Sequence, residues 1–67
     1  MKPLTAQEVE RILKAHGFRL ASSNGSHFKW TDADGRRSVP VPHHGNRPIR
    51  QGTLHSIFRL AGIPPPR

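Results

Sequence analysis

The hydrophobic residues near the start of the chain recur with the period of an α-helix. The stripe, with spacings of three and four residues, consists of Val9, Ile12, Leu13 and His16. Residues Thr5 to Glu8 have the spacing of a capping box, and Gly17 stands where a left-handed C-terminal cap is expected. The pattern predicts an amphipathic helix that begins at Thr5 and ends near His16. Its polar side is predicted to carry Glu10, Arg11 and Lys14.

The period then changes to two, which is typical of β-strands. A first strand is expected at residues 18–22, before the turn dipeptide Asn24-Gly25, with Ser22 on the face of Phe18 and Leu20. A second strand is expected at residues 26–31. Alternation there places Phe28 and Trp30 on one face. The other face receives His27, Lys29 and Thr31.

The hairpin dipeptide Asp34-Gly35 introduces a third strand at residues 36–41. Its valines, Val39 and Val41, are expected to point inward. Pro40 has no N–H to donate to a neighbouring strand, so this strand is expected at an edge of the sheet.

A loop with His43 and His44 follows, and a second helix is expected to start between Ile49 and Thr53. The apolar stripe of this helix is Leu54, Ile57, Phe58 and Ala61. The order helix-strand-strand-strand-helix predicts an α+β fold, in which both helices cover one face of a three-stranded antiparallel sheet. Residues 1–63 are expected to form one domain, and residues 64–67 an extended Pro-rich tail.

The charge of the chain indicates a polyanionic partner. Its 67 residues include 11 Lys and Arg against 4 Asp and Glu, which gives a net charge of +7 and a pI near 11.8. Nucleic acid is favoured because Lys and Arg displace counterions from phosphates, while an anionic membrane surface and an acidic protein remain alternatives. The sequence has neither a membrane-spanning apolar run nor a secretory signal, so we expect a cytoplasmic protein.

His27 is the candidate for chemistry on RNA. It shares a strand face with Lys29 and follows a Gly-Ser turn that permits close approach of a phosphate backbone. Metal-free RNA cleavage requires a group that takes the proton of the ribose 2′-OH, cations beside the phosphate, and a proton donor for the leaving oxygen. Imidazole titrates near neutral pH and is suited to the first or last of these tasks. Lys29, Arg36 and Arg37 are candidates for the electrostatic part.

The other histidines have simpler interpretations. His16 is expected to pack or to cap its helix, and His55 is expected to be solvated, with possible contact to RNA. His43 and His44 either line the RNA-binding site or are solvated. No metal site or cofactor is expected, because adjacent histidines lack the spacing of helical metal ligands, and Asp32 and Asp34 are explained by their turn. The absence of cysteine also excludes disulfides and thiolate zinc sites.

Several short motifs together resemble the HicA toxin family over residues 4–63. These motifs are Gly25-Ser26-His27-Phe28, Asp34-Gly35-Arg36, Val41-Pro42-His43-His44-Gly45-Asn46, Gly52-Thr53-Leu54-His55-Ser56-Ile57 and Ala61-Gly62-Ile63. The resemblance implies a fold like that of a double-stranded RNA-binding domain and an mRNA endonuclease with His27 as its catalytic residue. It also implies neutralisation by a HicB-type antitoxin that covers the active site.

Three positions depart from the family pattern. Pro48 stands where an acidic residue is usual, and Gln51 where a proline is usual, so the first turn of the second helix is affected. Phe28 follows the predicted catalytic histidine where a second histidine is often found. Lys29, His43 and His44 are therefore the candidates for protonation of the leaving group.

Three functions remain open from the sequence. The first is a metal-independent endoribonuclease toxin that acts on mRNA. The second is a non-catalytic RNA-binding module, in which basic side chains contact phosphates and 2′-hydroxyls by shape. The third is an interaction protein whose basic face docks an acidic partner.

Overall fold

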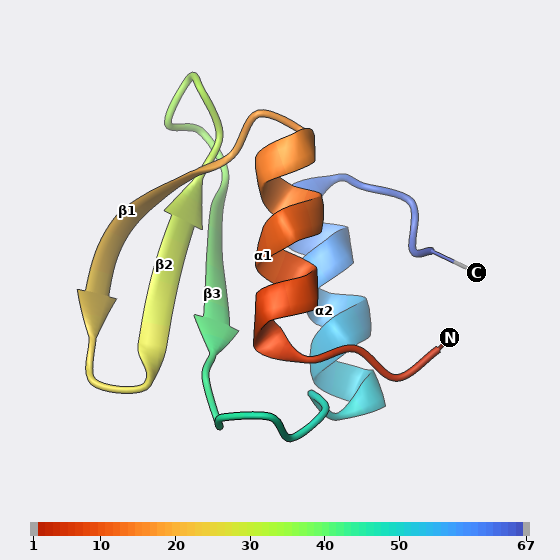
Figure 1. The fold of residues 1–67 in the computed structure, drawn as a ribbon. Coiled ribbons are helices and arrows are strands. Elements are labelled where there is room, and N and C mark those ends of the chain that lie inside the picture. The colour runs from red at the N-terminus through yellow and green to blue at the C-terminus, as the bar shows by residue number, and fades with distance from the viewer. Residues whose placement is uncertain (1, 67) are drawn as a thin grey trace.

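The computed structural model describes residues 2–66. Its elements are α1 (Ala6–Ala15), β1 (Arg19–Asn24), β2 (His27–Thr31), β3 (Ser38–Pro42) and α2 (Gln51–Ala61). The strands form one antiparallel sheet in the order β1-β2-β3, and both helices lie on one side of it, beside β3 (Figure 1). The predicted α+β fold and element order are therefore confirmed. The expected domain and tail also include Met1 and Arg67, which lie outside the described residues.

α1 begins where the sequence predicts, because its capping box is complete. The Glu8 backbone N–H donates to Thr5 Oγ1 at 3.4 Å, and the Thr5 backbone N–H donates to Glu8 Oε1 at 2.9 Å. These bonds satisfy backbone donors that the first turn of a helix leaves without partners. At the other end, His16 donates through Nδ1 to the Ile12 carbonyl oxygen at 3.0 Å. His16 therefore caps the helix, which is one of its two predicted roles.

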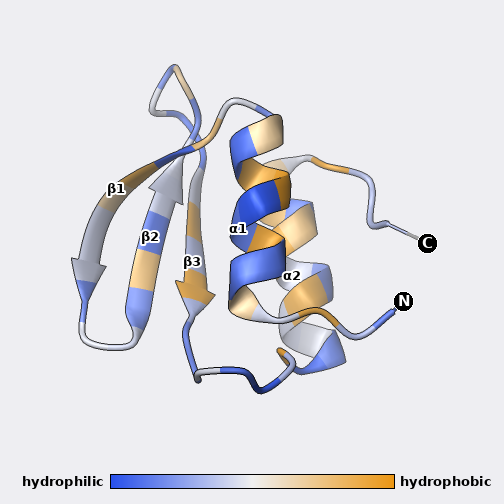
Figure 2. Cartoon of the chain, viewed as in Figure 1, coloured by the Kyte–Doolittle hydropathy of each residue, from blue (hydrophilic) through white to orange (hydrophobic). Residues whose placement is uncertain are grey.

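The core lies between the two helices and one face of β2 and β3. The largest fully buried side chains are Val9, Leu13, Val39, Val41, Leu54, Ile57 and Phe58. Trp30 is also buried, and Phe28 packs against the core from a partly exposed position. Figure 2 shows hydrophobic colour where the helices and β3 meet, and hydrophilic colour along the lower loop. The inward orientation of both valines of β3 and of the aromatic residues of β2 is as predicted.

β1 differs from the prediction in both extent and alternation. It runs two residues further, to Asn24, and its pairing with β2 shifts between Leu20 and Ser22. The extra residue of this β-bulge reverses the faces that follow. Ser22 therefore pairs with Lys29 on the open face, and its predicted place beside Leu20 was wrong. All six residues of β1 are exposed, so this strand contributes little to the core.

β3 begins two residues later than predicted because a side chain holds the preceding turn. Asp32 Oδ1 accepts from the backbone N–H groups of Arg36 and Arg37 at 2.9 and 3.2 Å. These bonds keep both arginines in the turn, so the strand starts at Ser38. β3 is an edge strand, as the proline within it predicts.

The start of α2 falls within the predicted window, at Gln51, but it has no side-chain cap. Its position is fixed by the N-terminal segment, since the Ile49 N–H donates to the Leu4 carbonyl oxygen at 2.8 Å. The helix ends at Gly62, whose φ of 69° closes a left-handed cap, and the Ile63 N–H donates to the Phe58 carbonyl oxygen at 3.1 Å.

The capping box predicts a pH dependence of stability. The bonds from the Thr5 backbone and then the Thr5 side chain lower the pKa of Glu8 below its ordinary value of 4.5. A carboxyl group whose pKa is lowered by folding stabilises the fold above its unfolded pKa, and this contribution is lost as the pH falls through the folded pKa. We expect Glu8→Ala to be less stable than the native chain at pH 7, with a difference that shrinks below pH 4.5.

Urea unfolding between pH 7 and pH 3 would measure this difference. Glu8→Gln is the matched control, because its amide oxygen can still accept the Thr5 N–H but carries no charge. Its stability relative to Glu8→Ala should stay constant with pH. A native-minus-Glu8→Ala difference that is also constant would contradict the prediction.

Candidate active site

His27 is exposed on the face of the sheet that the helices leave uncovered. It is the first residue of β2, and its neighbour Phe28 turns toward the core. The turn before it contains Gly25 with a φ of 63°, which is a left-handed conformation that glycine adopts without strain. The imidazole therefore stands at the rim of the sheet, next to a tight turn, where a large substrate has access.

Lys29 shares this open face with His27. The two Cα atoms are about 7 Å apart, since residues i and i+2 of a strand are separated by two rises. Across the sheet, His27 pairs with Asn24 and Pro42, and Lys29 pairs with Ser22 and Pro40. These short side chains leave space above the imidazole and the ammonium group. The pair can transfer a proton and hold positive charge beside a phosphate.

Arg36 and Arg37 lie at the other end of the sheet. They belong to the turn beyond Thr31, and the length of β2 alone separates Thr31 from His27 by about 13 Å. Arg37 donates through Nη1 to the Leu60 carbonyl oxygen at 3.3 Å, which places its positive charge at the C-terminal end of α2. The structure therefore places the two arginines away from His27, beyond the opposite end of β2.

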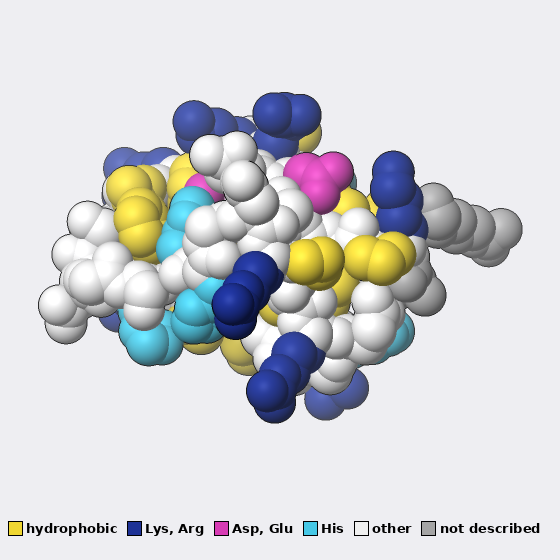
Figure 3. Space-filling view, turned by 60° about the horizontal axis from the view of Figure 1, so that its bottom comes forward, with side chains coloured by type: hydrophobic (Ala, Val, Ile, Leu, Met, Phe, Trp, Pro, Cys, Tyr) yellow, Lys and Arg dark blue, Asp and Glu magenta, His cyan; other side chains and the backbone are white. Residues whose placement is uncertain are grey.

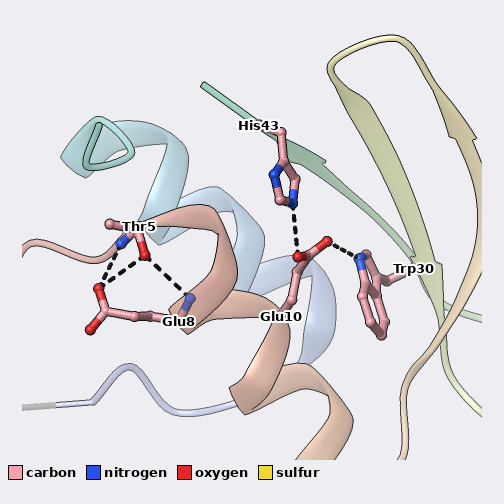
Figure 4. Close-up of polar contacts among 5 residues, drawn as sticks. All are labelled: Thr5, Glu8, Glu10, Trp30 and His43. Carbon is pink, nitrogen blue, oxygen red and sulfur yellow. Dashed lines mark hydrogen bonds and ion pairs between the residues drawn. The ribbon is translucent and has the colours of Figure 1, made fainter. Parts of the chain in front are cut away.

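His43 turns to the opposite face of the sheet from His27. Its ring lies against Phe28, with centroids 4.2 Å apart, and its Nε2 donates to Glu10 Oε1 at 2.8 Å. The other carboxylate oxygen, Glu10 Oε2, accepts from Trp30 Nε1 at 2.8 Å (Figure 4). One carboxylate thus joins α1 to β2 and to the segment after β3.

Glu10 lies at the edge of the predicted polar side of its helix, where it lines a hollow beside Trp30 with Arg11 and Lys14. Its side chain is only 14% exposed. The sequence contains a signal for this low exposure, because Glu10 stands four residues after the buried Ala6 and three before the buried Leu13. A buried indole N–H also requires a hydrogen-bond acceptor, so a tryptophan on the inward face of a strand predicts an acceptor close to its ring.

His44 is exposed at the same end of the molecule as His27. It lines a groove of about 450 Å³ with Pro42, Arg47, Pro48, Ile49, Arg50 and Thr53. Pro42 is also the cross-strand partner of His27, so the groove adjoins the open face. Figure 3 shows imidazole, Lys and Arg side chains gathered at this end, where β2 and both helices begin. His55 is exposed on α2, as predicted.

Two further properties concern residues 2–66 as described. Within this range, no three His, Asp or Glu side chains come together in a group that would hold a metal ion. No helix in the same range has the length and apolar character required to cross a membrane.

Comparison with known proteins identifies the family. A family model described as HicA toxin of bacterial toxin-antitoxin matches residues 6–63, from the first turn of α1 to the residue after the cap of α2. A protein of Pseudomonas fluorescens (strain Pf0-1) named "Probable mRNA interferase HicA" is 36% identical over 56 residues, which cover 84% of this chain and 90% of the relative. The fold and the match define a small toxin of a bacterial toxin-antitoxin system. The chain belongs to the HicA toxin family, and the resemblance in its motifs is confirmed.

The Glu10 carboxylate should be important for stability. Glu10→Ala removes the hydrogen-bond acceptor of the Trp30 indole N–H, and Trp30 is only 4% exposed. A buried donor without a partner costs about 1–3 kcal/mol. We expect the free energy of unfolding to fall by that amount in urea titrations. The exposed neighbour Arg11 provides the control, since Arg11→Ala should change it by less than about 0.5 kcal/mol. Equal losses in both variants would contradict this assignment.

Proposed function

We propose that the chain is a metal-independent endoribonuclease toxin that cleaves mRNA, with His27 as its catalytic residue, and that a HicB-type antitoxin neutralises it. The observation that carries the proposal is the exposed imidazole of His27 beside Lys29 on the open sheet face of a HicA-family chain. The name of the Pseudomonas fluorescens relative, a probable mRNA interferase, supports the reaction.

The reaction requires one proton acceptor and one proton donor. In the proposed step, the imidazole of His27 accepts the proton of a ribose 2′-OH, and the 2′-oxygen attacks the adjacent phosphorus. The bond from phosphorus to the 5′-oxygen breaks, and that oxygen receives a proton. The products are a 2′,3′-cyclic phosphate and a free 5′-hydroxyl. The ammonium of Lys29 stabilises the additional negative charge on the phosphate oxygens in the transition state.

Three side chains are candidates for the proton on the leaving oxygen. Lys29 lies on the face of His27, and His44 is exposed at the same end of the sheet. His43 is held by Glu10 and Phe28 on the face of the sheet opposite to His27. Lys29 and His44 are therefore the stronger candidates, and His43 supports the segment that carries His44.

Arg36 and Arg37 have a role in RNA binding away from the cut site. Arg36 and Arg37 are too far from His27 to contact the reacting phosphate, so we assign them to phosphates elsewhere along the strand. The net charge of +7 also suits an acidic antitoxin that covers the open face. Since mRNA is the proposed substrate, the proposed site of action is the cytoplasm.

The decisive test is cleavage of a defined mRNA in the presence of EDTA. We expect the native chain to cut it and His27→Ala to be at least about 100-fold slower, as the loss of a general base predicts. His16→Ala is the matched control, because His16 is an exposed imidazole at the far end of α1. Circular dichroism and thermal unfolding would show that all three proteins are folded, and mass spectrometry would identify the cyclic phosphate.

Each alternative outcome contradicts part of the proposal. RNA that is bound but not cut would favour the non-catalytic RNA-binding module. Cutting that survives His27→Ala would move the active site elsewhere, and cutting that EDTA abolishes would refute metal independence. Weak RNA binding with tight binding of the antitoxin would favour the pure interaction protein.

A comparison of Lys29 with Arg36 tests where on the sheet the reacting phosphate binds. We expect Lys29→Gln to lower kcat by about 10-fold or more, because its charge stands beside the reacting phosphate. Arg36→Gln removes the same charge from the far end of β2, so we expect it to raise KM while kcat stays within about 2-fold. Steady-state kinetics on a short fluorogenic RNA would separate the two. A larger loss of kcat in Arg36→Gln would contradict the location of the site.

A further inference from the structure

We propose that the groove between the end of β3 and the start of α2 binds phosphodiester groups of the RNA strand beside the cut site. We call it the β3–α2 groove, lined by the seven residues Pro42, His44, Arg47, Pro48, Ile49, Arg50 and Thr53. The inference rests on the proposed function for its substrate, and it assigns a binding role to residues outside the open sheet face. Its occupant is single-stranded RNA.

The groove carries positive charge that the rest of the described chain does not neutralise. Arg47 and Arg50 are both exposed, and within residues 2–66 the one ion pair is that of His43 with Glu10. His44 adds an imidazole and Thr53 a hydroxyl to the same walls. This combination of cations and a hydrogen-bonding group suits the oxygens of successive phosphates.

None of the four acidic side chains lines the groove. Asp32 belongs to the turn between β2 and β3 at the other end of the sheet, and Asp34 lies in the same turn. Glu8 is bonded to Thr5, and Glu10 to Trp30 and His43. The lining of the groove therefore carries basic and neutral side chains only, although Glu8 and Glu10 lie on the neighbouring helix.

The walls of the groove are held in place before any ligand binds. The Arg47 N–H donates to the His44 carbonyl oxygen at 3.2 Å, which closes a turn through Gly45 with a φ of 63°. Pro48 forms a bridge with Thr5, and the Ile49 backbone is bonded to Leu4. A preformed site loses less conformational entropy when it binds a flexible strand.

The groove is continuous with the predicted catalytic residue. Pro42 forms its wall nearest the sheet and stands directly opposite His27 in the β2–β3 register. A strand whose 2′-OH lies at His27 can therefore pass over Pro42 into the groove. The first turn of α2 opens toward it without a side-chain cap, so backbone N–H groups are available as additional donors.

The experiment measures RNA binding without cleavage. Arg47→Gln/Arg50→Gln is made in the full chain with His27→Ala, and binding of a fluorescein-labelled single-stranded RNA of about twelve nucleotides is titrated at several salt concentrations. We expect about 10-fold weaker binding near 0.1 M salt. The slope of log K against log salt should become shallower by about 1.4, because each phosphate contact of a single strand contributes about 0.7.

A matched control separates the groove from net charge. Arg11→Gln/Arg59→Gln removes the same two charges from exposed positions on α1 and at the last turn of α2, outside the groove. We expect it to leave the slope within about 0.3 of the parent. Equal changes in both double variants would overturn the inference, as would unchanged RNA binding together with lost binding of an acidic protein partner. This assay measures binding and needs no cutting. If the groove variant weakens RNA binding but the native chain cuts no RNA, the proposed nuclease function is refuted and the RNA-binding role of the groove is retained.

Discussion

The alternation of β2 is the constraint on which the candidate site depends. The strand must bury Trp30 and partly bury Phe28 against the helices, and its period of two then exposes His27 and Lys29 on the opposite face. A slip of one residue would bury a lysine and an imidazole and expose two aromatic rings. The hydrophobic effect that forms the small core therefore also determines which residues meet a substrate.

The carboxylate of Glu10 connects this core to the loop between β3 and α2, which lines the proposed RNA-binding groove. It accepts from the indole of Trp30 on the helix-covered face of the sheet and from His43 at the start of the loop that leads to α2. Ile49, at the end of that loop, is bonded to the backbone of Leu4, just before α1. Both ends of the loop are thus fixed by the N-terminal part of the chain, which lies far from it in sequence.

The fold could be predicted because each element carries a local signal. The capping box fixes the start of α1, the aromatic alternation fixes the faces of β2, and the proline of β3 indicates an edge. The site was only partly predictable, since His27 and Lys29 are neighbours on one strand whereas the separation of Arg36 from His27 depends on the length of the hairpin. The spacing of Glu10 from Ala6 and Leu13 signals its low exposure, but its bonds to Trp30 and His43, like the bulge in β1, depend on contacts between distant segments that a local pattern does not encode.

The exposure of β1 has a consequence for how copies of the chain meet one another. As an outer strand, it presents unpaired backbone N–H and C=O groups, which can recruit a strand of a second molecule and begin aggregation. The irregular register between Leu20 and Ser22 bends this outer edge, and Arg19 adds charge at its start. The same defect that moved Ser22 to the open face thus protects a small, basic chain against unwanted self-association through its sheet.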